Sequence, residues 1–275
     1  MYQPLPVSIP SDSSSTLTGV IMILRKRFTR FVLPIAVGVL IAIFSGSIHA
    51  QKHDPGVILK QMSEAIANLD KFIVTGDGYV DARLDAGQII EHSMDVTLSV
   101  NRPKAMRVTN RDAESTKEIY FEDGVLTIYT NNRNFYAQTE IPAGVDEAAR
   151  YAVNELGIDA PMLDFLFNDV SAHLLEDAES TEYLGLSLFR DKTYHHIGIR
   201  MAELDLQLWI AAEGSPLPGK MTISMKWEAG SPRSVFFLSW DTQPDWSGKT
   251  FTFAPPAGST RIEFDPDSHQ LGAEQ

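Results

Sequence analysis

Short β-rich segments, grouped in two blocks at residues 72–139 and 181–264, constrain the fold of this chain more than any other feature. Within each block, runs of β-branched and aromatic residues are separated by the small and polar residues of tight turns. The pair Asp123–Gly124, between "KEIYFE" and "VLTIYT", predicts a two-residue hairpin because both residues tolerate a positive φ. Consecutive hairpins pair antiparallel, so the two blocks predict an antiparallel sheet of about eleven strands.

Helical patterns lie before the first block and between the two blocks. Asp54 and Pro55 are typical of a helix start, and apolar residues then recur at helical spacing from Ile58 to Leu69. Residues 145–177 predict a group of short helices, of which the segment "PMLDFLF" is the most apolar. Because a helix this apolar must be buried or cover an apolar surface, we expect it to pack against the sheet.

One segment shows a strand with a dry and a wet face. In "KMTISMKW", residues 220–227, the residues Met221, Ile223, Met225 and Trp227 alternate with lysine, threonine and serine. This alternation is typical of a sheet that is covered on one side only. The predicted fold is α+β: a strongly curved antiparallel sheet, or incomplete β-barrel, closed by an amino-terminal helix and an inserted helical lid at residues 145–177.

The first fifty residues are expected to lie outside the folded domain. Residues 1–21 are polar and rich in serine and proline, which predicts disorder. If translation starts at Met22, these residues are an untranslated upstream extension. Residues 22–50 have the basic stretch, short apolar core and small residues of a secretory signal peptide. A membrane anchor is the alternative, since the uncharged span counted to Ile48 reaches 18 residues. Residues 51–275 then form a single domain.

Charge and cysteine content narrow the compartment and the partners. The chain has no cysteine, which excludes disulfides, cysteine nucleophiles and thiolate metal sites. Residues 1–50 hold four of the 23 basic and one of the 36 acidic residues, so the remainder has 19 and 35, a net charge of −16. Such a surface repels nucleic acids and anionic membranes, and neither is expected as a partner. A secreted domain of this size folds without disulfides, and we expect it in the bacterial periplasm, with inner-membrane anchoring as the alternative.

The pair His195–His196 is the best lead to an enzyme. Adjacent residues on a strand point to opposite faces, so the two imidazoles cannot easily bind one metal ion. Two interpretations stay open: a structural role on the strand, or a hydrolase in which one histidine works with nearby acids. The segment "GDGYVD", residues 76–81, lacks the third glycine of a dinucleotide loop and predicts instead a kink or bulge in a strand. No cofactor and no metal site are expected.

Aromatic side chains suggest an apolar cavity between the sheet and the helices, although core packing is an alternative explanation. The position of Trp209 is open, because Leu206, Leu208 and Ile210 share one face of their strand and Trp209 points to the other. It lines a cavity only if its face is the concave one. The residues expected to contact a ligand are Phe165, Phe167, Trp209, Met221, Ile223, Met225 and Trp227.

Two segments carry a resemblance to a known family. "SVNRPKAMRV" at residues 99–108 and "FEDGVLTIYTNNRNFY" at residues 121–136 resemble the periplasmic lipoprotein carrier family LolA. "DLQLWIAAEGSPLPGKMTI" and "FTFAPPAGSTRIEF" are more similar to an uncharacterised family of predicted periplasmic proteins in the same superfamily. The resemblance covers roughly Pro55 to Phe264.

The resemblance implies an incomplete β-barrel whose apolar cavity accepts acyl chains under a helical lid. It also implies that Arg102 latches the lid through hydrogen bonds to helix carbonyls, a role that suits a guanidinium with five donors. LolA hands over its cargo through a basic surface, and the acidity of this chain departs from that pattern.

The function expected from the sequence is therefore a periplasmic binding or carrier protein for a lipid, a lipoprotein acyl chain or another apolar ligand. One alternative is an envelope-stress sensor or interaction module with an envelope protein as partner. A second is a hydrolase that uses His195 or His196. The ligand and the oligomeric state are not specified by the sequence.

Overall fold

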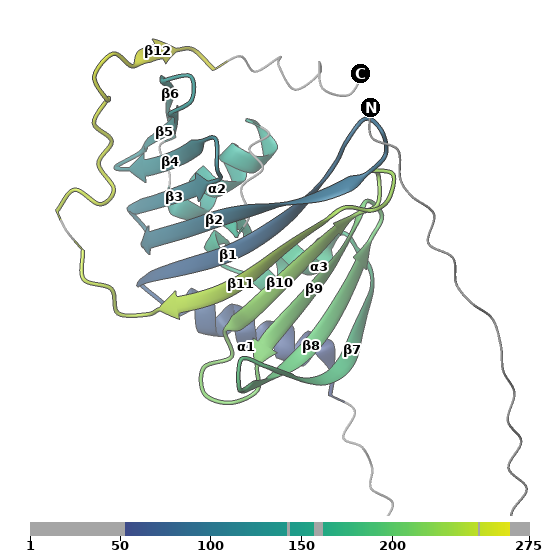
Figure 1. Cartoon of the computed structure of the whole chain (residues 1–275). Coiled ribbons are helices and arrows are strands. Elements are labelled where there is room, and N and C mark those ends of the chain that lie inside the picture. Colours follow the sequence, from purple (N-terminus) through teal and green to yellow (C-terminus); the bar gives the residue numbers. More distant parts are fainter. Residues whose placement is uncertain (1–52, 142–143, 157–161, 247, 265–275) are drawn as a thin grey trace, which may run out of the picture. The chain divides into compact units, whose positions relative to one another are not determined.

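The computed structural model describes residues 53–141, 144–156, 162–246 and 248–264, which build one large sheet with helices against one face (Figure 1). The predictions for residues 1–50 lie outside these described residues. The helices are α1 (Pro55–Ala67), α2 (Val145–Asn154), the 3₁₀ helix η1 (Leu163–Leu166) and α3 (Val170–Glu176). The strands are β1 (Lys71–Arg83), β2 (Ile89–Asn101), β3 (Ala105–Arg111), β4 (Thr116–Glu122), β5 (Val125–Thr130), β6 (Phe135–Glu140), β7 (Ala178–Phe189), β8 (Lys192–Met201), β9 (Leu204–Ala211), β10 (Pro218–Met225), β11 (Arg233–Asp241) and β12 (Thr260–Ile262).

The sheet has the strand order β12-β6-β5-β4-β3-β2-β1-β11-β10-β9-β8-β7. Every neighbouring pair is antiparallel except β12 with β6, which is parallel. The two sequence blocks meet where β1 pairs with β11, and the edge strands β12 and β7 do not pair with each other. The predicted α+β class and open, curved antiparallel sheet are confirmed, with twelve strands rather than about eleven.

Two local signals of the sequence are confirmed. The carboxylate of Asp54 accepts a hydrogen bond from the backbone N–H of Gly56 at 2.9 Å, so it caps α1 as expected. Asp123 and Gly124 have φ angles of 49° and 84°, the positive values that a two-residue hairpin between β4 and β5 requires. Among the described residues, no helix is both long and apolar enough to cross a bilayer.

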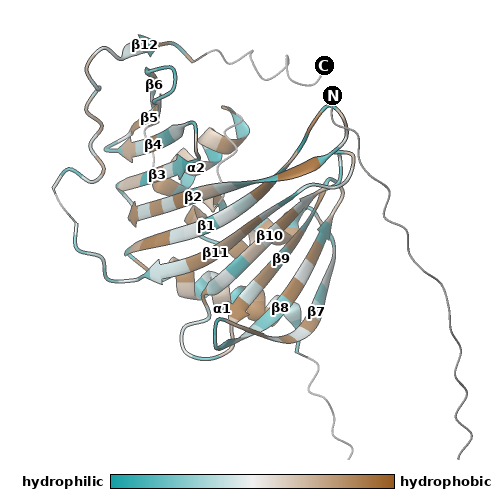
Figure 2. Ribbon diagram, in the orientation of Figure 1, coloured by the Kyte–Doolittle hydropathy of each residue, from teal (hydrophilic) through white to brown (hydrophobic). Residues whose placement is uncertain are grey.

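The core lies between the helix-bearing face of the sheet and the helices. Figure 2 shows hydrophobic and hydrophilic residues alternating along the strands, as a sheet with one covered face requires. Two glycines of the "GDGYVD" segment belong to this covered face of β1. A Cβ atom on Gly78 would lie 2.4 Å from the Phe236 ring, and one on Gly76 would lie 3.3 Å from the Met162 side chain. The segment is therefore a regular strand against which large side chains pack; the predicted bulge is wrong, because residues 76–81 pair with β2 without a register shift.

The opposite, outer face of β3 to β6 is covered by the chain after β11, which Figure 1 shows running outside these strands to β12. The ring of Phe253 lies 5.4 Å from Tyr120, 5.9 Å from Tyr129 and 5.2 Å from Tyr136, measured between centroids. The guanidinium of Arg107 pairs with Glu118 and donates to the carbonyl of Thr250 at 3.5 Å. The "FTF" segment of residues 251–253 thus supplies packing rather than a further strand.

Candidate functional site

The candidate site is formed by the inserted helices, which we call the lid: residues 145–156 and 162–176. The predicted apolar segment is buried against the sheet, and each of its large side chains is at most 2% exposed; these are Met162, Leu163, Phe165, Leu166 and Phe167. They join one continuous hydrophobic core with α1 and the central strands. The lid therefore fills the concave side of the sheet in this structure.

Arg102 connects the lid to the turn after β2. Its Nη1 donates to the carbonyl of Leu166 at 2.8 Å, and its Nη2 donates to the carbonyl of Phe165 at 3.1 Å. Its own backbone N–H donates to the carbonyl of Asp70 at 2.7 Å, which fixes the base of the side chain. Burial lowers the pKa of the Arg102 guanidinium from its ordinary value, and the nearby charge of Asp146 acts in the opposite direction. The group is thus a partly buried cation that grips two consecutive carbonyls.

An aromatic cluster lies beneath this clamp. Trp240 of β11 contacts Phe72 of β1 at 5.4 Å and Phe165 of the lid at 5.5 Å between ring centroids. The indole N–H of Trp240 donates to the carbonyl of Pro218 at 2.8 Å, which fixes the ring between strand and lid. Because a hydrogen bond holds its polar edge, the rest of the indole can pack into the apolar core.

Two carboxylates hold the lid at other points. Asp146 accepts hydrogen bonds from the backbone N–H of Asn168 at 2.8 Å and from Nε of Arg150 at 2.9 Å, joining α2 to the segment before α3. Asp169 caps α3 by accepting from the N–H of Ala172, and it also accepts from the hydroxyl of Ser63 on α1 at 3.2 Å. The hydrogen bonds of Asp169 hold its pKa below the ordinary value.

The predicted ligand-contact residues separate into two groups. Phe165, Phe167 and Met221 are buried on the helix-bearing face, and Ile223 and Met225 are partly buried on β10. Trp227 instead follows the end of β10 and is 56% exposed, because the strand stops at Met225 and a turn begins. The expected interior position of Trp227 is therefore corrected.

Trp209 lies on the outer face of the sheet. Its strand neighbours Leu206, Leu208 and Ile210 belong to the core, so alternation places the indole opposite to the lid. There it stacks on His196 at 4.1 Å, and the Lys220 ammonium lies 4.2 Å from the ring centroid. The face of Trp209 is thus not the concave one, and it does not line a cavity under the lid.

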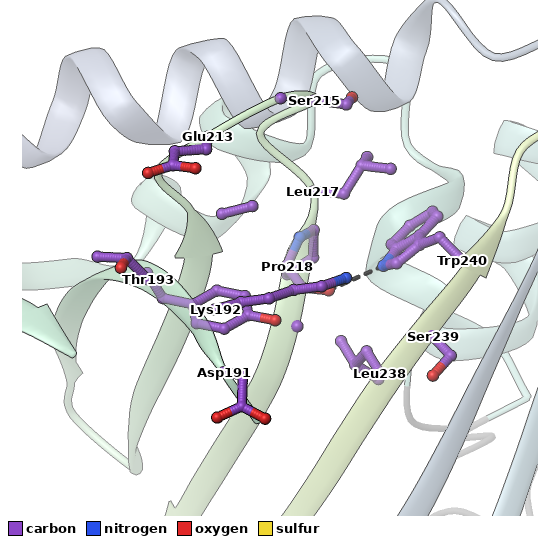
Figure 3. Close-up of a pocket in the computed structure, with 14 residues that line it drawn as sticks. Asp191, Lys192, Thr193, Glu213, Ser215, Leu217, Pro218, Leu238, Ser239 and Trp240 are labelled. Carbon is purple, nitrogen blue, oxygen red and sulfur yellow. Dashed lines mark hydrogen bonds between the residues drawn. The ribbon is translucent and has the colours of Figure 1, made fainter. Parts of the chain in front are cut away.

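One pocket lies beside Trp240 and another beside Arg102. A pocket of about 670 Å³ opens beside Trp240 (Figure 3), between the β7–β8 turn, the β9–β10 loop and the end of β11. A second pocket of about 400 Å³ lies beside Arg102 and is lined by Asp70, Asp146 and other polar residues. On the helix-bearing side of the sheet, the apolar side chains of the lid pack directly into the hydrophobic core.

The two histidines point to opposite faces, as adjacent strand residues must. Nδ1 of His195 lies 3.1 Å from the Tyr183 hydroxyl, and Nε2 of His196 lies 3.0 Å from the side-chain oxygen of Gln207. Burial lowers the pKa of both imidazoles. Within the described ranges neither has a carboxylate partner, and no cluster of three or more histidine, aspartate or glutamate side chains could hold a metal ion. The hydrolase alternative thus gains no support from the geometry.

Sequence reasoning did not assign roles to Trp240, Asp146 or Asp169. Asp169 had a local signal, since an aspartate directly before "VSAHLLE" is typical of a helix cap. The local sequence around Asp146 and Trp240 gives no such signal, because the partners of both residues lie on distant parts of the chain.

Comparisons with known proteins identify a family and several structures of low identity. The sequence model of a family described as "Predicted periplasmic protein (DUF2092)" matches residues 56–265. No curated protein sequence matches the chain. An uncharacterised conserved protein of Thermus thermophilus is 7% identical with a TM-score of 0.45, over 75% of this chain and 97% of that one.

Two further structures are similar at the same level. The lipoprotein LppX of Mycobacterium tuberculosis is 12% identical with a TM-score of 0.41, over 70% of this chain and 99% of that one. A LolA superfamily protein of Nitrosomonas europaea is 13% identical with a TM-score of 0.36, over 73% and 98%. Since these scores are all low, it is the family match over most of the described chain that carries the assignment.

Proposed function

This chain belongs to the family of predicted periplasmic proteins DUF2092, and on that basis we propose that it binds or carries a lipid or acyl chain beneath the lid. The periplasmic location agrees with the one expected from the amino-terminal residues. The observation that carries the proposal is the Arg102 clamp, which holds an almost wholly apolar lid segment against the sheet by its backbone carbonyls.

The apolar lid gives the proposed binding its driving force. When the lid is closed, its side chains and the sheet cover each other; when it opens, both surfaces need another apolar cover. An acyl chain supplies that cover, at roughly 0.8 kcal/mol for each methylene removed from water. The proposed contacts are with Phe165, Phe167, Met221, Ile223 and Met225.

Arg102 sets the balance between the closed and the open lid. Opening breaks two hydrogen bonds donated by a charged group, each contributing about 1.5–3 kcal/mol. The free energy of ligand binding must exceed the cost of breaking these two hydrogen bonds, so the Arg102 clamp keeps the lid closed when no ligand is bound. Binding requires no chemical step, and we propose that the protein is not an enzyme.

The test combines native mass spectrometry after gentle extraction with uptake of a fluorescent fatty acid. We expect the wild-type protein to retain or take up an apolar ligand, and Arg102→Leu to take it up faster because the lid opens more often. Arg133→Leu, which removes an exposed arginine in the β5–β6 turn, serves as the control. A wild-type protein and an Arg102→Leu variant that both lack ligand and take up no fatty acid would contradict the proposal.

A further inference from the structure

The edge strand β7 carries an unusual surface. It pairs with β8 on one side, and no described strand pairs with its other side. Three of its leucines are exposed: Leu184 by 48%, Leu186 by 62% and Leu188 by 75%. Edge strands of stable monomers are normally short or charged, because unpaired backbone groups beside apolar side chains invite another strand.

A bulge limits which part of β7 can accept a strand. The pairing with β8 shifts between Tyr183 and Gly185, so Leu184 is the extra residue. After the bulge the register is regular up to Phe189. Gly185 still belongs to the bulge, with a φ of 105°, and residues 186–189 after it present an uninterrupted row of backbone groups.

The side chains of residues 185–189 alternate between the two faces. Leu186 lies opposite His195, and Leu188 lies opposite Thr193, so both leucines share the face that bears the helices. Gly185 and Phe189 lie on the outer face. A Cβ atom on Gly185 would have no atom within 4 Å, so the space above this glycine is empty.

We propose that β7 of a second copy of this chain pairs antiparallel with this edge, around a two-fold axis at Ser187. In that register Leu186 of each copy lies opposite Leu188 of the other, so the two most exposed leucines of the strand cover each other. Gly185 of each copy lies opposite Phe189 of the other, whose ring stacks on Phe237 of its own chain at 5.2 Å, so the glycine leaves room for the second strand to approach. The side chains along this part of β7 thus complement those of a second copy, as the interface of a closed two-fold dimer requires.

Charge at the two ends of the row agrees with this register. Glu182 is exposed before the bulge, and β7 is followed by Arg190 and Asp191 in the turn and Lys192 at the start of β8, a net charge of +1. Antiparallel pairing brings the acidic end of one copy toward the basic end of the other. The interface therefore does not oppose like charges, although the chain as a whole is acidic.

A lipid bilayer fits the same surface poorly. Inserting Leu186 and Leu188 into hydrocarbon would also bury the unpaired N–H and C=O groups of the edge, and these have no partner in lipid. A second strand satisfies these groups and covers the leucines together. A strand is thus the occupant that matches both features.

The proposal is tested by sedimentation velocity over a wide concentration range, using the protein as exported by the cell. We expect a concentration-dependent dimer. The Leu186→Lys/Leu188→Lys variant places like charges opposite each other and should weaken dimerisation roughly a hundredfold or more, because central apolar contacts dominate such interfaces. Leu84→Lys/Ile89→Lys, at residues exposed by 43% and 41% beside the β1–β2 turn, is the matched control and should dimerise as the wild type does.

Hydrogen exchange of the wild-type protein gives a readout that does not depend on variants folding. Amides of residues 185–189 should become less protected on dilution, while those of the central strand β1 should not change. A wild-type protein that stays monomeric at every concentration, or a dimer that the leucine substitutions leave intact, would refute the proposal. Flotation of a monomeric protein with phosphatidylcholine vesicles, abolished by the same substitutions, would assign the surface to a membrane instead.

Discussion

At the scale of single residues, the contact between Arg102 and the lid depends on the shape of the guanidinium. Its two terminal nitrogens reach the carbonyls of Phe165 and Leu166 at the same time. A lysine has one ammonium group on a flexible chain and cannot hold two carbonyls in a fixed geometry. The residue type therefore determines how firmly the lid is held.

We predict that Arg102→Leu lowers the free energy of unfolding by about 3–6 kcal/mol, because it removes both charged hydrogen bonds to the lid carbonyls. The free energy of unfolding of Arg102→Lys should lie between those of Arg102→Leu and the wild type. Urea denaturation measures the change, with Arg133→Leu as the control. Equal stability of all four proteins would show that the contact contributes nothing to closure.

Gly78 tests the packing of the covered face. Gly78→Ala should destabilise the protein by roughly 1–3 kcal/mol, since its Cβ would overlap the Phe236 ring. Gly248→Ala, where a Cβ meets no atom within 4 Å, should have little effect. Adding Phe236→Leu to Gly78→Ala should recover part of the loss, and the absence of any recovery in thermal unfolding would argue against steric overlap as the cause.

Trp209 shows what the sequence could establish about a residue and what it could not. The alternation along the strand predicted that Trp209 points to the other face from Leu206, Leu208 and Ile210, and this is confirmed. Which of the two faces bears the lid depends on contacts with helices far away in the chain, which no local pattern contains. The prediction for Trp227 was wrong for another reason. The alternation of polar and apolar residues continues through Lys226 and Trp227, whereas the strand ends at Met225.

At the scale of elements, the lid is anchored by caps and hydrogen bonds as well as by apolar packing. Asp169 caps α3 and at the same time bonds Ser63, so one carboxylate joins two helices. The helices themselves were predicted at residues 145–177 because their apolar spacing is local. Their attachment was not, because Arg102 and Ser63 lie far from them in sequence.

Asp169 makes the stability of this junction depend on pH. Its hydrogen bonds, first that from Ala172, lower the pKa of the folded state below the ordinary 3.8. Its contribution is therefore complete above pH 3.8 and is lost as the pH falls through the lower folded value. We predict that Asp169→Ala costs about 1 kcal/mol at neutral pH. Urea denaturation should show this difference shrinking in acid, and a difference independent of pH would contradict the assignment.

The chain segment after β11 protects the outer face of β4. Burial, together with the charge of Glu118, raises the pKa of Tyr120 to about 12. Because Phe253 packs on Tyr120, Phe253→Ala should expose the phenol and bring its pKa down toward the ordinary 10.0. Ultraviolet titration measures this, and Tyr120→Phe identifies the signal. An unchanged titration would mean that other atoms shield the ring.

At the scale of the whole molecule, the pairing of β1 with β11 makes one sheet from two sequence blocks. The sequence predicted the class of the sheet and nearly all of its strands, since both follow from local pattern. It could not predict the strand order, because the partner of β1 lies at the other end of the chain and many strands could compete for it.

A single sheet should unfold as one unit. All four tryptophans, Trp209, Trp227, Trp240 and Trp246, lie in the second half of the chain, so their fluorescence reports on that half alone. We predict that fluorescence and circular dichroism give the same urea midpoint. Two separate midpoints would show that the halves of the sheet are independent.

The β1–β11 pairing also has a consequence for how the protein folds during and after its synthesis. Asp77 lies opposite Phe237, so the central strand acquires its second neighbour only after 160 further residues have been synthesised. Contacts this remote in sequence form slowly. The sheet cannot be completed before β11 has been made, which favours export of the polypeptide through a narrow channel before its fold is finished.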